Sequence, residues 1–322
     1  MSDSLYTRLI TQATLAPSGH NTQPWRFSIQ DDSTICIAPD LSRTLPIVDG
    51  DNRELFISLG CAAENLVLAA SEQGYTAQVR NDEATGNIRI HLDKQLVEPN
   101  PLATQITRRQ TNRSLYSAQR ISDDVITQLQ QTPTETGTHI FLYANGTAPY
   151  IKISEYILQA DALQIRNPAF KQELKTWLRY NKKHQDQTRD GLSYAVFGAP
   201  NVPRWIAEIV MSLAMRESAQ RKSCQQQISH TSHFALFTLE QQTVSHWINL
   251  GRTLQHFLLA ATAQNIAHSY LNQPCEERAV AQNMAQALSL NTSPAILIRL
   301  GYAAPRPYSL RRHIADVIDN SR

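Results

Sequence analysis

The chain has 322 residues with a formal net charge of +2, and hydrophobic residues make up 42% of it. A chain of this length can bury a substantial core, and its near-neutral charge, with no block of five or more like charges, argues against a nucleic-acid surface built on bulk basicity. The four cysteines are far apart and form no CxxC pair, which is typical of a reducing compartment rather than a disulfide scaffold.

The N-terminal region shows no targeting signal. Its first twenty residues contain no basic segment followed by an apolar one, so no signal peptide is predicted. No apolar run approaches the ~18 residues that a membrane-spanning helix needs. We therefore expect a soluble, cytoplasmic protein with neither a nucleic-acid nor a membrane partner.

Helices and strands alternate along much of the chain. Helical spacing predicts helices at Leu5–Leu15, Glu54–Gln73, Ile121–Gln131, Ala148–Gln164, Pro168–Lys182, Arg204–Lys222, Gln241–Gln264 and Glu276–Leu288. Alternating or apolar runs predict strands at Arg26–Gln30, Thr34–Ala38, Ile88–Leu92, His139–Tyr143, His233–Leu239 and Ala295–Leu300. Residues 176–223 do not fit this alternation, and we interpret them either as a lid that covers a pocket or as a surface insertion without a role.

Two of the predicted helices resemble each other. The segment from Gly60 to Ser71 aligns without gaps with the segment from Gly251 to Thr262, so that the glycines and a Leu-Ala-Ala triplet coincide. Small residues on one side would let two such helices approach closely. Amphipathic helices often match by chance, so this repeat alone does not establish a duplication.

A polar loop joins the first predicted helix to the first predicted strand. Its sequence is Ala16-Pro17-Ser18-Gly19-His20-Asn21-Thr22-Gln23-Pro24-Trp25. Prolines stiffen the backbone, small residues allow close approach, and the amide of Asn21 can donate and accept hydrogen bonds. This set suits the polar edge of a planar heterocycle, although the same residues also form ordinary buried turns.

A basic turn lies in the other part of the chain, at Arg108-Arg109-Gln110-Thr111-Asn112-Arg113. Arg109, Thr111 and Arg113 are spaced so that two guanidinium groups and a hydroxyl can converge on one anion. The alternative is a solvated basic turn.

Motifs for other kinds of chemistry are missing from the sequence. It contains no Rossmann or nucleophile-elbow motif. His230-x-x-His233 lacks further ligands, so no metal site is predicted.

The polar loop resembles the P-S-[SA]-x-N-x-Q-P-W signature of the FMN-dependent nitroreductase family. The resemblance implies that Pro17, Ser18, Gly19 and Asn21 contact the isoalloxazine ring of FMN. Because Gly19 stands where the family often has serine, any hydroxyl contact at that position is lost.

The basic turn is similar to the R-x-[ST]-x-[RK] motif with which nitroreductases bind the FMN phosphate. The resemblance therefore assigns phosphate binding to Arg108, Arg109, Thr111 and Arg113. Family members also end with a basic residue that reaches the phosphate, and one or both of Arg311 and Arg312 match it.

The predicted helix that contains Gly251 is followed by Leu271-Asn272-Gln273. In the family the corresponding turn places backbone N–H groups near flavin N5 and O4, so these three residues are expected to bind the cofactor. Asn272-Gln273 replace the Glu-Gly pair that is common there, so the acidic side chain of the family is missing at this place.

Each motif occurs once, in complementary parts of the chain. The family's homodimers take the arginine motif from one subunit and the loop from the other, so the resemblance is to a fused, Acg-like branch. It implies an α+β nitroreductase fold, internally duplicated as a pseudo-dimeric monomer, with a first half at residues 1–100 and a second half at residues 101–322.

The function expected from this resemblance is oxidoreduction through one FMN. Hydride from NADH or NADPH would reach flavin N5 and then a small-molecule electron acceptor such as a nitro compound or a quinone, with no catalytic side chain needed. The alternative is a non-catalytic FMN storage protein whose lid excludes the nicotinamide. A chain that has lost FMN is a weaker third alternative.

Overall fold

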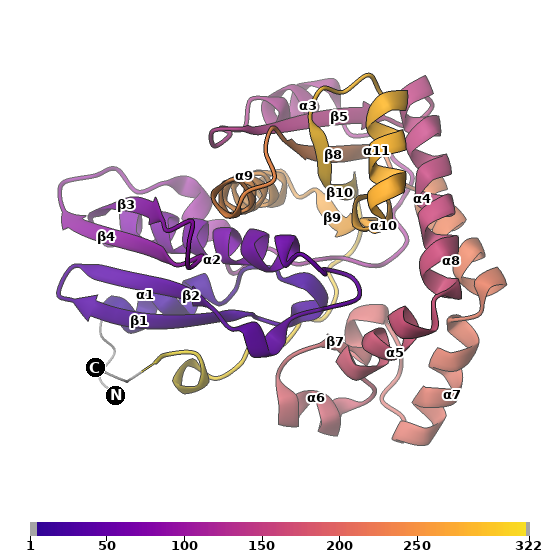
Figure 1. Ribbon diagram of the computed structural model, residues 1–322, viewed down its shortest axis with the longest axis horizontal. Helices are drawn as coiled ribbons and strands as arrows, with labels where there is room; N and C mark the ends of the chain where they lie inside the picture. Colours follow the sequence, from indigo (N-terminus) through magenta and orange to yellow (C-terminus); the bar gives the residue numbers. More distant parts are fainter. Residues whose placement is uncertain (1–4, 320–322) are drawn as a thin grey trace.

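The computed structural model describes residues 5–319 and combines two four-stranded antiparallel sheets with helices, which confirms the predicted α+β class (Figure 1). The first sheet and its helices comprise α1 (Leu5–Ala13), β1 (Trp25–Asp31), β2 (Thr34–Pro39), α2 (Arg53–Glu72), β3 (Tyr75–Asn81) and β4 (Ile88–Lys94). The second comprises α3 (Asp123–Gln130), β5 (Thr138–Ala144), β8 (His233–Leu239), α9 (Val244–Ala263), β9 (Ala267–Tyr270) and β10 (Ser293–Gly301).

The two sheets have the same topology. The strand order is β1-β2-β4-β3 in the first and β5-β8-β10-β9 in the second, and all of these pairs are antiparallel. In each sheet a helix precedes the first strand and a long helix joins the second strand to the third. The chain is therefore built from two units with the same order of elements, as the repeated helices suggested. The division at residues 100 and 101 stays a prediction.

The long helices α2 and α9 pack against each other at the centre of the molecule, and α9 lies between the two sheets (Figure 1). Gly60 and Gly251 lie at their closest approach. A Cβ atom built on Gly60 would lie 2.0 Å from the carbonyl oxygen of Ile248, and one on Gly251 would lie 2.0 Å from that of Ile57. Only glycine fits at either position, and the reciprocal contacts make the crossing nearly symmetric.

One continuous apolar core joins the two units. It contains buried side chains from both sheets and both central helices, including Phe27, Leu66, Phe237 and Phe257. The aromatic rings of Phe237 and Phe257 meet edge to face with centroids 5.3 Å apart. The halves therefore share a core rather than forming two separately packed domains.

The second unit carries a long insertion between β5 and β8, where the first has only a hairpin turn. It consists of α4 (Ala148–Arg166), α5 (Pro168–Trp177), β6 (Leu178–Arg179), α6 (Lys182–Thr188), β7 (Leu192–Ser193), α7 (Arg204–Ala214) and α8 (Glu217–Ser229). The predicted lid at residues 176–223 is thus the middle of a longer excursion. Figure 1 shows α5, α6, β7 and α7 as a group beside the two sheets, connected to them by α4 and α8.

Several element boundaries differ from those predicted. The predicted helix Arg204–Lys222 is two helices, because Arg216 adopts an extended backbone between them. The predicted helix Pro168–Lys182 ends at Trp177, where Leu178 leaves it to pair with β7. The predicted helix Glu276–Leu288 begins at Arg278 as α11 (Arg278–Ala287), since Glu277 is extended, and the short α10 (Gln273–Glu276) that precedes it was not predicted. Strands β3, β6, β7 and β9 were not predicted.

The C-terminal tail returns from the second sheet to the first. The backbone N–H of Phe27 donates to the carbonyl of Val317 at 2.8 Å, and Asp319 donates back to the carbonyl of Phe27 at 2.7 Å. This return carries residues 302–312 past the loop that follows α1 and brings the last arginines of the chain to it.

Helix α2 is 20 residues long and its mean hydropathy, 1.3, is high enough for a membrane span by length and composition, although Glu64 and Asn65 interrupt its apolar residues. However, 83% of its apolar window is buried inside the protein. Its position against α9 accounts for its composition.

Candidate functional site

A cavity of about 550 Å³ lies where the two units and the insertion meet, a size typical of small-molecule and cofactor sites. Its walls come from the loop after α1, the start of α2, the segment before α3, the β9–α10 turn, the C-terminal tail and the insertion. The predicted residues that line it are Pro17, Ser18, Gly19, Asn21, Arg109, Thr111, Arg113, Asn272, Gln273 and Arg311. Motifs that are far apart in the sequence therefore converge on one cavity.

The loop after α1 forms a compact turn on this wall. Its residues Gly19–Asn21 form a short 3₁₀ helix in which His20 and Asn21 have φ angles of 47° and 57°. The hydroxyl of Ser18 accepts a hydrogen bond from the backbone of Gln23 at 2.9 Å, which closes the turn. A Cβ on Gly19 would lie 3.1 Å from Leu45 and 3.4 Å from Glu54, so a small residue is favoured there.

Two arginines meet at the carbonyl groups that follow α1. Arg109 donates from Nη2 to the carbonyl of Leu15 at 2.9 Å, and Arg311 donates to the same oxygen at 3.1 Å. Arg311 also donates to Thr14 at 2.8 Å and to the side chain of Asn21 at 3.0 Å. The partial negative charge at a helix C-terminus favours cations at this place.

Arg109 is only 4% exposed, yet its Nε and Nη1 atoms have no hydrogen-bond partner within residues 5–319. Buried donors are rarely left unpaired in native proteins. Because the side chain lines the cavity, a ligand with acceptor oxygens would satisfy them.

Burial is the main cause that lowers the pKa of Arg113 to about 10 and that of Arg311 to about 9, and for Arg311 the neighbouring Arg109 adds to the effect. Burial also lowers the pKa of Arg109. All three remain charged at neutral pH. No carboxylate in the described part of the chain pairs with any of them, so the cluster is an uncompensated positive site.

Three predicted residues do not reach the cavity. Arg108 is exposed and bonds to Gln105 and Asn265 on the outer surface. The side chain of Leu271 points into the apolar cluster that also contains Phe234 and Met284, and its backbone N–H, the group expected to face the flavin, donates to the carbonyl of Leu297 at 3.1 Å. We therefore no longer place either side chain in the site.

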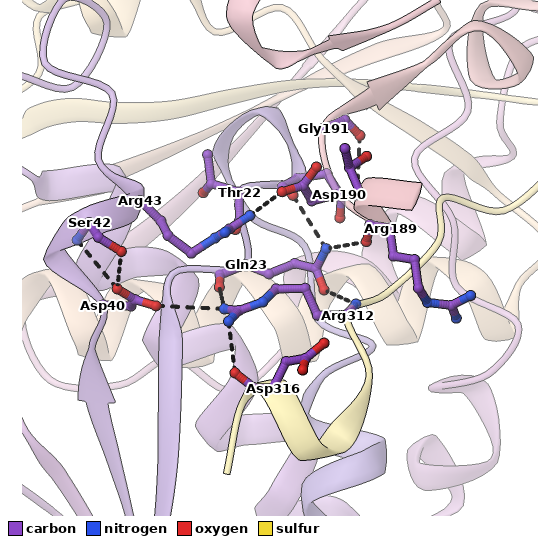
Figure 2. Close-up of polar contacts among 12 residues, drawn as sticks. Thr22, Gln23, Asp40, Ser42, Arg43, Arg189, Asp190, Gly191, Arg312 and Asp316 are labelled. Carbon is purple, nitrogen blue, oxygen red and sulfur yellow. Dashed lines mark hydrogen bonds and ion pairs between the residues drawn. The ribbon is translucent and has the colours of Figure 1, made fainter. Parts of the chain in front are cut away.

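Arg312 is the third of these residues. Figure 2 shows its guanidinium among Gln23, Asp40 and Asp316, where it donates to the carbonyl of Asp316 at 2.7 Å and lies 3.6 Å from the Asp40 carboxylate. Since adjacent residues in an extended tail point in opposite directions, Arg311 reaches the cavity and Arg312 holds the tail to the first sheet.

Two acidic residues on the cavity wall were not predicted. Glu54, at the start of α2, and Glu276, at the end of α10, both line the cavity. The amide of Asn272 donates to Glu54 at 2.5 Å and to Glu276 at 3.1 Å. Carboxyl groups therefore lie beside the predicted Asn272-Gln273 turn, although they come from other positions than the acid of the family.

The pKa of Glu54 is raised well above its usual value, first by burial and then by the nearby charges of Glu276 and Asp49. Burial likewise raises the pKa of Glu276, although the hydrogen bonds from Gln164 and Asn272 lower it in part. Burial is also the main cause that raises the pKa of Asp49 to about 6. Burial and mutual repulsion on this wall of the cavity therefore favour the protonated form of its carboxyl groups.

The raised pKa of Glu54 predicts how stability changes with pH in a Glu54→Gln variant. A carboxyl that binds its proton more tightly in the folded state stabilises the protein fully below its unfolded pKa, about 4.3, and loses that contribution as pH rises through the folded pKa. The glutamine does not titrate. The free energy of unfolding of the variant, relative to the wild type, should rise by about 1 kcal/mol or more from pH 5 to pH 8. Urea denaturation at each pH measures it, and the exposed Glu72→Gln is the control. A constant difference would show that Glu54 is ionised in the folded protein.

The insertion closes one side of the cavity with Gln164, Phe170 and Leu192. It is fastened to the loop after α1 by Gly191, which exchanges hydrogen bonds with Asn21: Gly191 N–H donates to the Asn21 carbonyl at 3.2 Å and the Asn21 amide donates to the Gly191 carbonyl at 3.1 Å. Gln23 adds a bond to the carbonyl of Arg189 at 2.9 Å.

An ion-pair cluster strengthens this attachment, and we call Arg43, Arg179 and Asp190 the latch (Figure 2 shows Arg43 and Asp190). Asp190 pairs with Arg43 from the first unit and with Arg179 from β6, the latter at 2.6 Å. All three side chains are less than one fifth exposed, so the pairs are poorly screened by solvent.

No group of three or more potential metal ligands occurs within residues 5–319. The two histidines of the His230-x-x-His233 pattern lie in different environments. His230 is on the surface after α8, whereas His233 is buried at the start of β8 beside Ser232.

The fold and the site thus define an α+β protein of two topologically equal units, with one cavity that joins a cationic cluster to a loop suited to a planar ring.

No protein-family model matches the chain. Two proteins of Mycobacterium tuberculosis strain H37Rv are similar to it over nearly its whole length. One, named "Putative NAD(P)H nitroreductase Rv3131", is 25% identical over 97% of this chain and 90% of its own. The other, named "Putative NAD(P)H nitroreductase acg", is 24% identical over 94% of this chain and 91% of its own. The resemblance to nitroreductases seen in the motifs is thereby confirmed.

Solved structures give more distant similarities. The FMN-dependent nitroreductase NfnB of Mycobacterium smegmatis, in complex with NADPH, is 16% identical, with a TM-score of 0.44 over 68% of this chain and 96% of its own. A Desulfovibrio desulfuricans protein described as "a putative nitroreductase in complex with fmn" is 13% identical, with a TM-score of 0.39 over 67% of this chain and 94% of its own.

Proposed function

We propose that this protein binds one FMN per chain in the cavity and works as an NAD(P)H-dependent oxidoreductase for a small electron acceptor such as a nitro compound or a quinone. Arg109, Arg113 and Arg311 would hold the phosphate, with Thr111 beside them. Pro17, Ser18, Gly19 and Asn21 would face the flavin ring.

The observation that carries the proposal is the uncompensated cationic cluster. Arg109 is buried and Arg113 and Arg311 are half-buried, no carboxylate of residues 5–319 pairs with them, and Arg109 keeps two unpaired donors on the cavity wall. Burying cations without a counter-charge is unfavourable unless a ligand supplies one, and a phosphate matches the forked donors of arginine. The full-length similarity to proteins named as nitroreductases supports FMN as the source of that phosphate.

One cofactor per chain is proposed because residues related by the duplication to two cavity-lining residues are paired with other groups of the protein. When Gly60 is matched with Gly251, Glu54 corresponds to Ser245 and Cys61 to Arg252. The backbone of Ser245 donates to Glu83 at 2.8 Å. Arg252 pairs with Glu135 at 2.6 Å and with Glu64 at 3.0 Å. At these two related positions the protein therefore supplies its own hydrogen-bond and ion-pair partners.

When bound, FMN supplies hydride transfer between the nicotinamide and the acceptor at its N5. The chain supplies the rest: the arginines fix the phosphate, the loop after α1 fixes the ring, and the insertion limits access of water. A non-catalytic FMN storage protein is the second candidate, and the latch favours it because a fastened insertion would exclude the nicotinamide.

Two measurements test these candidates. The absorption spectrum of the purified protein, before and after addition of FMN, tests binding, and a protein that stays colourless would contradict both. Anaerobic mixing of the FMN complex with NADH or NADPH then separates them. Rapid bleaching of the flavin is expected for the oxidoreductase. Absence of bleaching, with dithionite still able to reduce the flavin, would identify the storage protein.

The latch gives a further prediction. Asp190→Asn removes the charge that pairs with both Arg43 and Arg179, and breaking one partner of a poorly solvated ion pair is strongly unfavourable. We expect FMN to dissociate about tenfold faster or more, followed by the gain in flavin fluorescence on dilution. The control is Asp186→Asn, since Asp186 forms an ion pair with the exposed Lys182 one turn away on α6 and lies outside the latch. Equal dissociation rates in the two variants would mean that the latch does not control the cavity.

A further inference from the structure

The two carboxyl groups of the cavity wall are connected by one amide. Asn272 accepts a hydrogen bond from the backbone of Leu297 at 2.9 Å, which fixes its oxygen toward β10 and turns its NH₂ group to the cavity. The two hydrogens of that group are directed to Glu54 and Glu276. Gln164, from the insertion, donates to the second oxygen of Glu276 at 2.6 Å. Hydrogen bonds from Asn272 and Gln164 therefore hold the two carboxyl groups in place.

The groups around the pair favour a bound proton. Asp49 faces it from the turn before α2, where its carboxylate accepts the backbone N–H groups of Glu54 and Leu55. Arg53 is the cation that faces it, and Arg53 donates to the carbonyl of Cys275 at 2.8 Å instead of bonding to either glutamate. Tyr270 and the Cys275 thiol are the other titratable neighbours, and burial raises the pKa of both. Three carboxyl groups thus share one cation.

The pair also lies beside the proposed ring-binding loop. One oxygen of Glu54 is 3.4 Å from the point where a Cβ of Gly19 would be. Both glutamates line the same cavity as Arg109, whose unpaired donors indicate a ligand there.

Other proton-bearing groups on the wall are poorer donors. Burial, with Arg113 nearby, lowers the pKa of His20 to about 4, so its imidazole is neutral at physiological pH. Burial raises the pKa of Tyr270 far above its usual value, so its hydroxyl is a weaker acid than usual. A protonated carboxyl is the stronger acid of these groups.

We propose that Glu54 and Glu276, bridged by Asn272, share one proton and deliver it to the electron acceptor during its reduction. The proposal rests on the proposed function. Reduction of a quinone to a hydroquinone consumes two electrons and two protons. The reduced flavin gives both electrons and one proton as hydride. The second proton moves from the carboxyl to the quinone oxygen, so that the carboxyl O–H bond breaks as the new O–H bond forms. Water then returns a proton to the carboxylate.

The bound proton is tested first in the protein without FMN. Infrared spectroscopy at neutral pH is expected to show the carbonyl stretch of a protonated carboxyl group in the wild type. Glu54→Gln and Glu276→Gln should each abolish that band, while Glu72→Gln, at the exposed end of α2, should keep it. A wild-type spectrum without the band, or a band that survives both variants, would overturn the proposal. Two variants are used because either could fail to fold. Thermal unfolding detects such a defect, and the test is then made with the other variant.

Proton delivery is tested in the FMN complex with two acceptors. Ferricyanide takes electrons without a proton, whereas a quinone needs one. The flavin is first reduced with dithionite. In the Glu54→Gln variant, the quinone should then reoxidise the flavin about 100-fold more slowly than in the wild type. Ferricyanide should reoxidise it at the same rate in both proteins. Equal slowing with both acceptors, or no slowing with the quinone, would overturn the role. A protein that binds no FMN would overturn the proposed function, and with it the delivery step, while the infrared band still reports the shared proton.

Discussion

Replacement of Arg109 by alanine should weaken FMN binding by about 10- to 100-fold, because a hydrogen-bonded charge pair with a phosphate contributes about 1.5–3 kcal/mol. The double replacement with Arg311→Ala should weaken it further. Titration of the protein into FMN, followed by the change in flavin fluorescence, measures the affinity. The neighbouring Arg108→Ala is the matched control, since Arg108 lies on the outer surface and should leave the affinity within about twofold of the wild type.

Riboflavin, which lacks the phosphate, separates anion binding from structural damage. If Arg109 binds the phosphate, Arg109→Ala should weaken FMN binding and leave riboflavin binding nearly unchanged. Equal weakening of both ligands would mean that the loss of its bond to Leu15 disturbs the loop instead. Equal effects of Arg108→Ala and Arg109→Ala on FMN binding would contradict the assignment of the site.

The second large effect is expected at the crossing of the two central helices. Gly60→Ala and Gly251→Ala would each place a methyl group 2.0 Å from a carbonyl oxygen of the opposite helix, far inside contact distance. The helices would have to separate within a close-packed core, so we expect each variant to lose about 3 kcal/mol or more of unfolding free energy. Urea denaturation measures the loss.

Gly50→Ala is the control for these variants, because its nearest obstacle is the carbonyl oxygen of Pro46 at 3.4 Å. It should change stability by less than about 1 kcal/mol. Since Gly60 and Gly251 lie at one crossing, the double variant should lose less than the sum of the single losses. Near wild-type stability of Gly60→Ala would contradict the central packing of α2 against α9.

Local sequence patterns predicted much of the fold. Strand β8 was predicted with the bounds that the structure has, because a run of buried apolar residues is a strong local signal. The repeated glycine helices were also visible, since close packing demands small residues at fixed spacing. Strand β9 was missed because only four residues, Ala267–Tyr270, pair at the edge of the second sheet, where a short polar strand resembles a turn.

The candidate site was partly predictable because some of its residues belong to short local motifs. The loop after α1 and the Arg109 turn are short motifs, and each lies on the cavity wall. Which of two adjacent arginines faces the cavity depends on the direction of the side chains, which sequence spacing did not reveal for Arg311 and Arg312. Glu54 and Glu276 were not predicted as site residues, because only the fold brings them to Asn272. In the sequence, each resembles an ordinary acidic residue near a helix end.

A titration of the purified protein with FMN, read by calorimetry together with a parallel titration with riboflavin, tests the central claim most directly. The composite cavity predicts one FMN per chain and markedly weaker binding of riboflavin. Riboflavin has no phosphate group to pair with Arg109, Arg113 and Arg311. Two FMN per chain, equal affinity for both flavins, or no binding of FMN would contradict a single composite site between the two halves.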